Sequence, residues 1–380
     1  MPRFRFLALL LFVLTSSYCF PAPKPSKQFE ITGYVFTRGA ALTPGQVDGS
    51  RLTRINYAFS NIQGGRMVLG APTDAQNFAL LRGLRNTNPE LTVLVSVGGW
   101  LWSTNFSDMV LTAESRRVFE DSVMQFLTQY DLDGLDIDWE YPGMPGAGHP
   151  FRPEDKQNFT SLLRELRRRF DAVVRRSGKR LYLTIAMGSS DDVIANTEMN
   201  KVQKYVDTVN LMSYDYYEPG SESITGNHSP LFADPADPKH VSSADSVKAF
   251  EKAGVPSEKI LLGVPFYGHE WGEVPDQNHG LFQTGKPIPN AYAPYSAIDT
   301  SMLGQGFTRY WDDSAKVPFL YSADKHIFVS YEDPQSLKEK CQYIRTSKLG
   351  GIMFWEYFGD SNGKLLQTVN AELTSAPSAH

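Results

Sequence analysis

Eight short apolar runs recur along the sequence, and segments with helix-forming patterns separate them. The runs are rich in Val, Ile, Leu and Phe, and runs of this length are typical of strands buried on both faces. Strands that alternate with helices in a chain of 380 residues predict an α/β fold, namely a (β/α)8 TIM barrel. A doubly wound sheet is the alternative, but the sequence lacks the glycine fingerprint expected after an early strand. The predicted strands are Ile31–Phe36, Arg54–Asn61, Leu91–Val97, Leu132–Asp138, Leu181–Met187, Val206–Ser213, Ile260–Phe266 and Gly351–Trp355.

One long interval, residues 269–331, breaks this alternation. It is rich in Gly, Pro, Tyr and Asn and contains only short strand-like pieces, so it predicts a small α+β insertion between strands seven and eight. A long irregular loop is the alternative, although loops of that length are uncommon inside a compact protein. The barrel is then expected to comprise residues 29–268 and 332–370, and a C-terminal tail residues 371–380.

The N-terminus has the features of an export signal. Two arginines precede an apolar run, which predicts a signal peptide over residues 1–19, an extended lead-in over residues 20–28, and a secreted or periplasmic protein. A lipid anchor on Cys19 and an uncleaved membrane anchor are the alternatives. After cleavage Cys341 is the remaining cysteine, so no intrachain disulfide is expected.

The charge balance argues against two classes of partner. The formal net charge is −5, so the chain has no basic excess to attract nucleic acid or an anionic membrane. The arginines between residues 164 and 176 alternate with an apolar stripe, which predicts the solvated face of a helix. We expect a monomer that has no membrane contact once its signal is removed.

Four acids fall within the eight residues from Asp133 to Glu140, and apolar residues separate the last three. A strand directs every second side chain to one face, so Asp136, Asp138 and Glu140 are expected to line up. Carboxylates crowded in this way raise one another's pKa, as a catalyst needs when it holds one carboxyl protonated near neutral pH. A Mg²⁺ or Ca²⁺ site is the alternative, but the sequence has neither an EF-hand nor a Walker A loop. We expect no metal and no cofactor.

Active sites of barrels lie at the carboxyl ends of the strands, and this acid motif closes the fourth strand. Aromatic residues cluster at the corresponding ends of other strands, an arrangement that suits a sugar ring stacked beside a proton donor. The candidate residues at these ends are Tyr34, Phe59, Ser96, Gly99, Trp100, Met212, Tyr214, Asp215, Tyr267 and Trp355.

The motif Asp133-x-x-Asp136-x-Asp138-x-Glu140 resembles the signature of the glycoside hydrolase family 18 chitinases. Further segments resemble that family in the same order along the chain, from about residue 31 to residue 360. In the branch of the family that the sequence resembles, an α+β insertion lies between strands seven and eight. The matching segments are residues 55–59 (INYAF), 96–100 (SVGGW), 212–215 (MSYD), 226–231 (GNHSPL), 263–268 (GVPFYG) and 350–355 (GGIMFW).

The resemblance implies a retaining, substrate-assisted mechanism with an oxazolinium intermediate. Glu140 would then be the general acid and base, and Asp138 would orient the sugar's acetamido group. Asp136 would share a proton with Asp138. Tyr214 would donate a hydrogen bond to the acetamido oxygen, and Asp215 would contact the same sugar.

The resemblance implies supporting roles for the other candidates. Trp355 would stack under the reacting sugar, and Trp100 under the sugar beyond the scissile bond. Ser96 would hydrogen-bond Asp136, and Asp133 would fix one end of its strand. The remaining substrate-binding candidates are Met212, Tyr34, Phe59, Tyr267 and Gly99.

The substrate implied is chitin or a chitooligosaccharide, with β-1,4-linked N-acetylglucosamine. An endo-β-N-acetylglucosaminidase acting on the chitobiose cores of glycoproteins and a peptidoglycan-directed relative are alternatives within the class. A non-catalytic chitin-binding lectin is a third, although such relatives usually lose the final acid, and Glu140 is present. One departure is His269, where relatives often carry arginine, so the pH profile and the hold on Asp215 are open at this point.

Overall fold

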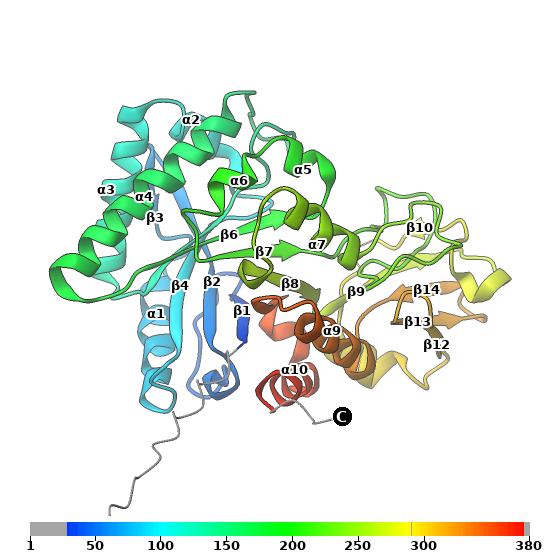
Figure 1. Cartoon of the computed structure of the whole chain (residues 1–380). Helices are drawn as coiled ribbons and strands as arrows, with labels where there is room; N and C mark the ends of the chain where they lie inside the picture. Colours follow the sequence, from blue (N-terminus) through cyan, green and yellow to red (C-terminus); the bar gives the residue numbers. More distant parts are fainter. Residues whose placement is uncertain (1–28, 290, 376–380) are drawn as a thin grey trace, which may run out of the picture.

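The computed structural model of the chain describes residues 29–289 and 291–375, and its main body is a closed barrel of parallel strands surrounded by helices (Figure 1). The predicted (β/α)8 barrel is therefore confirmed. Its strands are β1 (Glu30–Phe36), β2 (Arg54–Gln63), β4 (Thr92–Gly98), β5 (Gly134–Asp138), β6 (Tyr182–Gly188), β7 (Thr208–Met212), β8 (Ile260–Pro265) and β15 (Gly351–Trp355). Hydrogen-bonded pairing follows the order β1–β15–β8–β7–β6–β5–β4–β2, and β2 pairs with β1 to close the ring. The end of β2 also forms a hairpin with the short strand β3 (Arg66–Val68).

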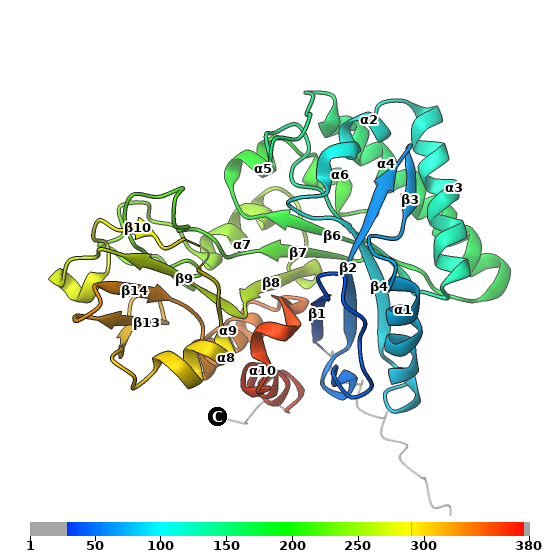
Figure 2. The ribbon, with the colours of Figure 1, turned by 180° about the vertical axis from the view of Figure 1, so that it is seen from behind.

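The helices between the strands cover the outside of the barrel (Figure 2). Two of the described helices begin with a capping box. Thr112 and Ser115 form a capping box at one, and Asp333 caps the other, which has Pro334 in its first turn. The helices are α1 (Asp74–Gly83), α2 (Phe106–Met109), α3 (Ala113–Gln129), α4 (Asp155–Ser177), α5 (Asp191–Ala195), α6 (Met199–Val202), α7 (Ser243–Lys252), α8 (Tyr295–Ala297), α9 (Pro334–Thr346) and α10 (Lys364–Thr374).

The last helix, α10, corrects the expected C-terminal boundary. We placed the start of a tail at residue 371, but α10 continues to Thr374 and packs against α9. Leu366, Val369 and Leu373 recur at helical spacing and are buried, which explains why the helix continues past that point.

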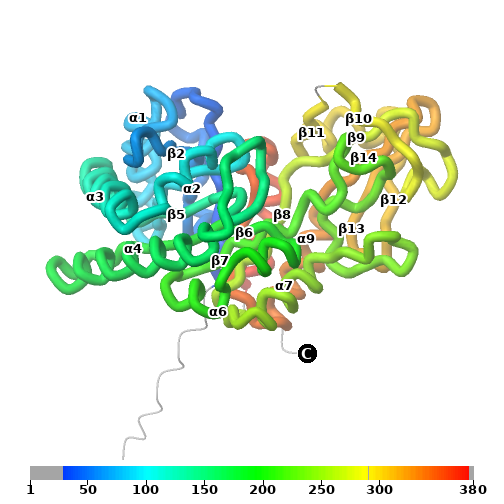
Figure 3. The backbone as a smooth tube through the Cα atoms, turned by 90° about the horizontal axis from the view of Figure 1, so that it is seen from above, coloured from blue at the N-terminus to red at the C-terminus, as the bar shows by residue number. Residues whose placement is uncertain are grey.

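A second sheet lies beside the barrel, between β8 and β15 in the chain (Figure 3). Its core includes Trp271, Phe319 and Phe328, and also Tyr217 from the loop after β7. The sheet starts at Tyr267, two residues before the expected insertion, and it draws on a segment outside the expected range. Its strands are β9 (Tyr267–Gly272), β10 (Lys286–Pro287), β11 (Ala293–Pro294), β12 (Thr308–Asp312), β13 (Val317–Ser322) and β14 (Ile327–Ser330).

The expected signal peptide, lead-in and Cys19 lie outside the described residues, as do the last five residues of the chain. Within the described part, none of the helices combines the length and the apolar character needed to span a bilayer.

Candidate active site

The acid motif lies at the carboxyl end of β5, as expected, but only part of it is on the strand. Asp136 and Asp138 are strand residues, whereas Glu140 follows the end of β5. Glu140 thus lies beyond the strand, while the charges of Asp136 and Glu140 both act on Asp138. The hydroxyl oxygen of Ser103 accepts a hydrogen bond from the backbone N–H of Glu140 at 3.0 Å, which fixes the chain where it leaves the strand.

Asp136 lies beneath the active-site cleft and is completely buried. Its two carboxylate oxygens accept four hydrogen bonds: from Tyr34 (2.9 Å), Ser96 (2.7 Å), Thr184 (2.5 Å) and Asn210 (3.0 Å). Burial raises its pKa, and hydrogen bonds from Thr184, Ser96 and Tyr34 limit that rise because they favour the ionised form.

Asp138 and Glu140 hold their protons more tightly than ordinary carboxyls. Burial raises the pKa of Asp138 well above its usual range, and the charges of Glu140 and Asp136 add to the rise. Burial also raises the pKa of Glu140 to about 7. Oδ1 of Asp138 is buried and has no hydrogen-bond partner among the described residues, so this group is best accommodated when a proton or a ligand donor meets it. The sequence argument gave like charge as the cause of such shifts, but burial is the larger one.

A cleft of about 1130 Å³ opens above these acids. Ten of the fourteen candidate site residues line it: Tyr34, Phe59, Trp100, Asp138, Glu140, Met212, Tyr214, Asp215, Tyr267 and Trp355.

The other four candidates lie behind or below the cleft. Asp136 and Ser96 form the buried hydrogen-bonded pair described above. Asp133 is at the opposite end of β5, where it accepts a hydrogen bond from the backbone N–H of Val93 at 2.7 Å and pairs with Arg85. Gly99 packs against the ring of Phe59, so its place among the substrate-binding residues is corrected to a supporting one.

Aromatic rings form one wall of the cleft. Trp355 stacks on Phe59 with ring centroids 5.5 Å apart and an interplanar angle of 23°. The ring centroid of Phe36 lies 5.5 Å from that of Trp355 and 6.0 Å from that of Trp102, so these rings extend the wall. Trp100 is 50% exposed at the rim, and such an exposed ring is free to stack on a ligand.

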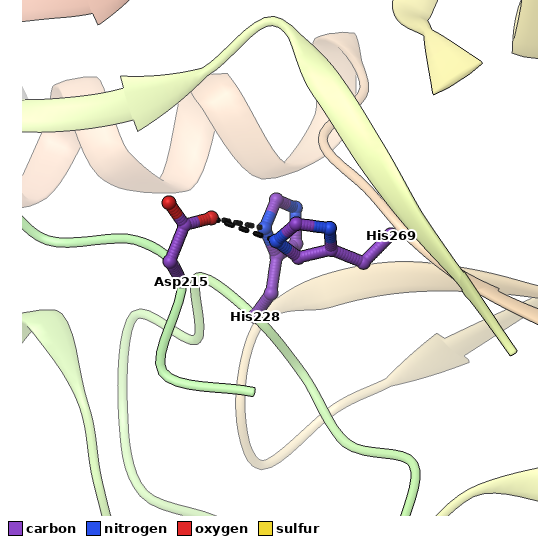
Figure 4. A group of neighbouring side chains, drawn as sticks. All are labelled: Asp215, His228 and His269. Atoms are coloured by element: carbon purple, nitrogen blue, oxygen red, sulfur yellow. Dashed lines mark hydrogen bonds and ion pairs between the residues drawn. The ribbon is translucent and has the colours of Figure 1, made fainter. Parts of the chain in front are cut away.

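Two histidines from different segments of the chain lie beside Asp215 (Figure 4). Its Oδ1 accepts a hydrogen bond from the hydroxyl of Tyr267 at 2.6 Å, and Nε2 of His269 is 2.8 Å from the same atom. Nδ1 of His228 is 3.6 Å from it. His269 therefore contacts Asp215 from the position where relatives often carry arginine.

The neighbouring imidazoles set the charge of this group. Burial alone would raise the pKa of Asp215, but His228 and His269 lower it below its usual range, so Asp215 is ionised. Burial lowers the pKa of His228 to about 4, so this imidazole is neutral near pH 7.

Sequence reasoning missed several residues of the site. Tyr141 lines the cleft beside Glu140, yet a strand running through residue 141 would direct it to the opposite face. Because β5 ends at Asp138, the chain turns and brings Tyr141 into the cleft. Trp102 follows the diglycine turn after a strand end, and that proximity was the available signal. His228 lies in the segment 226–231 that resembles the family, but it is not at a strand end, so the barrel pattern gave it no role.

Comparisons with known proteins agree with this geometry. The family model described as "Glycosyl hydrolases family 18" matches residues 30–360. Chitinase A1 from Niallia circulans is 36% identical, and the match covers 97% of this chain and 62% of that protein. The chain thus spans under two thirds of the length of that relative.

Solved structures give the same family. A glycoside hydrolase family 18 N-acetylglucosaminidase from Paenibacillus barengoltzii is 38% identical with a TM-score of 0.82, covering 90% of this chain and 99% of that one. A mutant class V chitinase from Nicotiana tobaccum, solved with NAG4, is 28% identical with a TM-score of 0.83, and the match covers 92% of this chain and 99% of that one. The matched segment includes the acid motif, the aromatic wall and the second sheet, and the chain therefore belongs to glycoside hydrolase family 18.

Proposed function

We propose that the protein is a chitinase that hydrolyses β-1,4 bonds between N-acetylglucosamine units with retention of configuration. The observation that carries this proposal is the pair Asp138 and Glu140, two buried carboxyls with raised pKa values at the base of an aromatic cleft. Burial raises the pKa of Glu140 to about 7, so it is available as a proton donor near neutral pH.

In the first step Glu140 transfers its proton to the glycosidic oxygen as the bond to the anomeric carbon breaks. The carbonyl oxygen of the sugar's own acetamido group attacks that carbon and forms an oxazolinium ion. Asp138 accepts a hydrogen bond from the acetamido N–H and offsets the positive charge that develops. Burial raises the pKa of Tyr214 well above its usual range, so its hydroxyl stays protonated and donates to the acetamido oxygen.

In the second step a water molecule loses a proton to Glu140 and attacks the anomeric carbon. This attack opens the oxazolinium ring and restores the acetamido group. Two inversions at the same carbon give retention. No enzymic nucleophile is required, and Asp136, held in place by its four hydrogen bonds, shares a proton with Asp138.

The aromatic wall supports a polysaccharide substrate. Trp355 would stack under the reacting sugar, and the exposed Trp100 under a sugar on the other side of the scissile bond. A cleft with aromatic rings on its wall and at its rim suits a chain of several sugars. Two of the relatives are named as chitinases. Chitin and its oligosaccharides are therefore the substrates we propose.

The test compares the wild-type protein with Glu140→Gln on chitooligosaccharides, a high-mannose glycopeptide, peptidoglycan and cellooligosaccharides. We expect turnover of chitooligosaccharides alone, and a loss of at least about 10²-fold in kcat for Glu140→Gln. Cellooligosaccharides lack the acetamido nucleophile and should not be cut. Cleavage of only the glycopeptide would favour an endo-β-N-acetylglucosaminidase, and binding without turnover would favour a lectin. Equal rates in the mutant would remove Glu140 from the mechanism.

A second candidate function is the release of single N-acetylglucosamine units from chain ends. The 38% identity to the N-acetylglucosaminidase from Paenibacillus barengoltzii, across 99% of that chain, favours it. Product analysis on a hexasaccharide separates the two, because monomer alone would appear at early times for the second candidate. Mixed oligomers would appear for an internal cut.

We also propose that the protein is exported, since a polymeric extracellular substrate requires it. The support is the sequence of residues 1–19. The experiment is N-terminal sequencing of the protein recovered outside the cells, and recovery solely from the cell interior would contradict the proposal.

A further inference from the structure

Asp215, His228 and His269 bring three potential metal ligands together at the side of the cleft (Figure 4). Their ligand atoms, Oδ1, Nδ1 and Nε2, all lie within 4.8 Å of one another. Two imidazoles and one carboxylate are a donor set typical of Zn²⁺ and Cu²⁺ sites. We propose that this cluster binds one Zn²⁺ or Cu²⁺ ion, and that the bound ion inhibits the enzyme.

The separations of Asp215 from the two imidazoles lie on either side of the value for a small tetrahedral ion. Metal bonds of about 2.0–2.2 Å place neighbouring ligand atoms roughly 3.4 Å apart. The separation of 3.6 Å between Asp215 and His228 is close to that value. The separation of 2.8 Å between Asp215 and His269 would have to open by about half an ångström, which a change in the side-chain torsions of His269 supplies.

His228 provides an independent reason to expect a ligand. Its side chain is completely buried, and neither ring nitrogen has a hydrogen-bond partner among the described residues. A buried imidazole without a partner is costly, whereas a metal ion at Nδ1 would satisfy it. The neutral form of His228 is the form that ligates.

The cluster also has an open position. The side chain of Asp215 is 39% exposed and lines the cleft, so a water molecule or a sugar hydroxyl can reach the fourth position of a bound ion. An ion on Oδ1 competes with the hydrogen bond from Tyr267 and changes the charge beside Glu140. The bound ion therefore acts as a reversible inhibitor.

The first test measures binding and does not depend on the proposed function. Isothermal titration of the full chain with Zn²⁺ should give one saturable site. Cu²⁺ in place of Zn²⁺ should give an electron paramagnetic resonance spectrum with coupling to two nitrogens. His269→Arg and His228→Asn each remove one ligand, and each should weaken binding by at least about 100-fold.

The control is His279→Asn, because His279 lies outside the cluster. Its ring stacks on that of Tyr310, a residue of the second sheet, with the ring centroids 4.0 Å apart. It should bind Zn²⁺ like the wild type. Circular dichroism reports whether His228→Asn folds, and if it does not, His269→Arg alone decides. The absence of a saturable site, or full binding in both cluster variants, would overturn the proposal.

The second test measures inhibition of chitooligosaccharide cleavage, and this part rests on the proposed function. Zn²⁺ should lower the wild-type rate at the concentration that saturates the site, and a chelator should restore it. Each variant is compared with its own metal-free rate, and His269→Arg should lose its sensitivity to Zn²⁺. Binding without inhibition would leave the site intact but contradict its effect on catalysis.

Discussion

The backbone N–H of Gly99 donates a hydrogen bond to the carbonyl oxygen of Asp138 across 2.7 Å. This bond ties the end of β4 to the end of β5 at the level of the acids. Gly98 makes the close approach possible, because a Cβ at that position would lie 2.1 Å from the same carbonyl oxygen. The diglycine turn therefore fixes the strand end from which Glu140 departs.

Alanine in this turn should destabilise the protein. Gly98 and Gly148 both have positive φ (108° and 76°), but a Cβ at Gly148 meets nothing within 4 Å. Gly148→Ala should cost only the backbone strain, about 1 kcal/mol. Gly98→Ala should cost about 1–3 kcal/mol more because of the clash. Denaturant unfolding measures both, and equal losses would contradict the clash.

The pH profile should have an alkaline limb set by Glu140. Its pKa is raised to about 7, mainly by burial, and the acid form is the one that donates a proton. We expect kcat/KM to fall about tenfold per pH unit above pH 7. Initial rates between pH 4 and 9 test this, with circular dichroism at each pH as the control for folding. A rate that stays constant up to pH 9 would exclude Glu140 as the acid.

The same shift predicts that Glu140 destabilises the folded protein at high pH. Its pKa rises from 4.5 in the unfolded chain to about 7 on folding, so the folded state binds more protons in that range. Stability is unaffected below pH 4.5 and falls as the pH rises through 7. Glu140→Gln should therefore be more stable than the wild type at pH 8, by on the order of 2 kcal/mol, and similar to it at pH 4. Thermal unfolding at the two pH values provides the measurement.

Tyr214→Phe should lower kcat by about 10²-fold with a small change in KM, because the hydroxyl is expected to act chiefly as the acetamido group attacks. Tyr217→Phe is the matched control. Tyr217 pairs with Asp237 away from the cleft, so its loss should affect stability and leave kcat unchanged. Similar kinetics for the two variants would contradict the role of Tyr214.

The buried ion pair between Lys340 and Glu332 should be costly to break on one side. Nζ of Lys340 also donates to the backbone carbonyl and the hydroxyl of Ser229, each at 2.7 Å. Lys340→Met leaves Glu332 without a counter-charge, at a cost of about 3–5 kcal/mol. Adding Glu332→Gln should recover part of this loss, as denaturant unfolding would show. A double variant as unstable as the sum of the single ones would contradict the coupling.

The barrel could be predicted because its strands are buried on both faces and therefore appear as apolar runs. The predicted strand bounds differ from those in the structure by at most two residues, as at the end of β2, Gln63 rather than Asn61. α10 was missed because it follows the last strand, where the alternation gives no further expectation. The spacing of its buried apolar residues was the one pattern that could have indicated this helix.

The site was predicted less completely, since side chains outside strands follow no simple period. Residues at strand ends, such as Tyr34 and Trp355, could be anticipated from the barrel alone. Tyr141 could not, because its position depends on where β5 stops. His228 lies in a segment that resembles the family, but its place beside Asp215 depends on a loop that folds back.

Tyr217 belongs to the loop after β7, yet it completes the core of the second sheet with Trp271 and Phe328. Excising residues 269–331 and rejoining the barrel would expose this ring to solvent. The smaller unit is thus not a module that can be exchanged by itself between scaffolds. Evolution or an engineer would have to gain, lose or transplant both segments together.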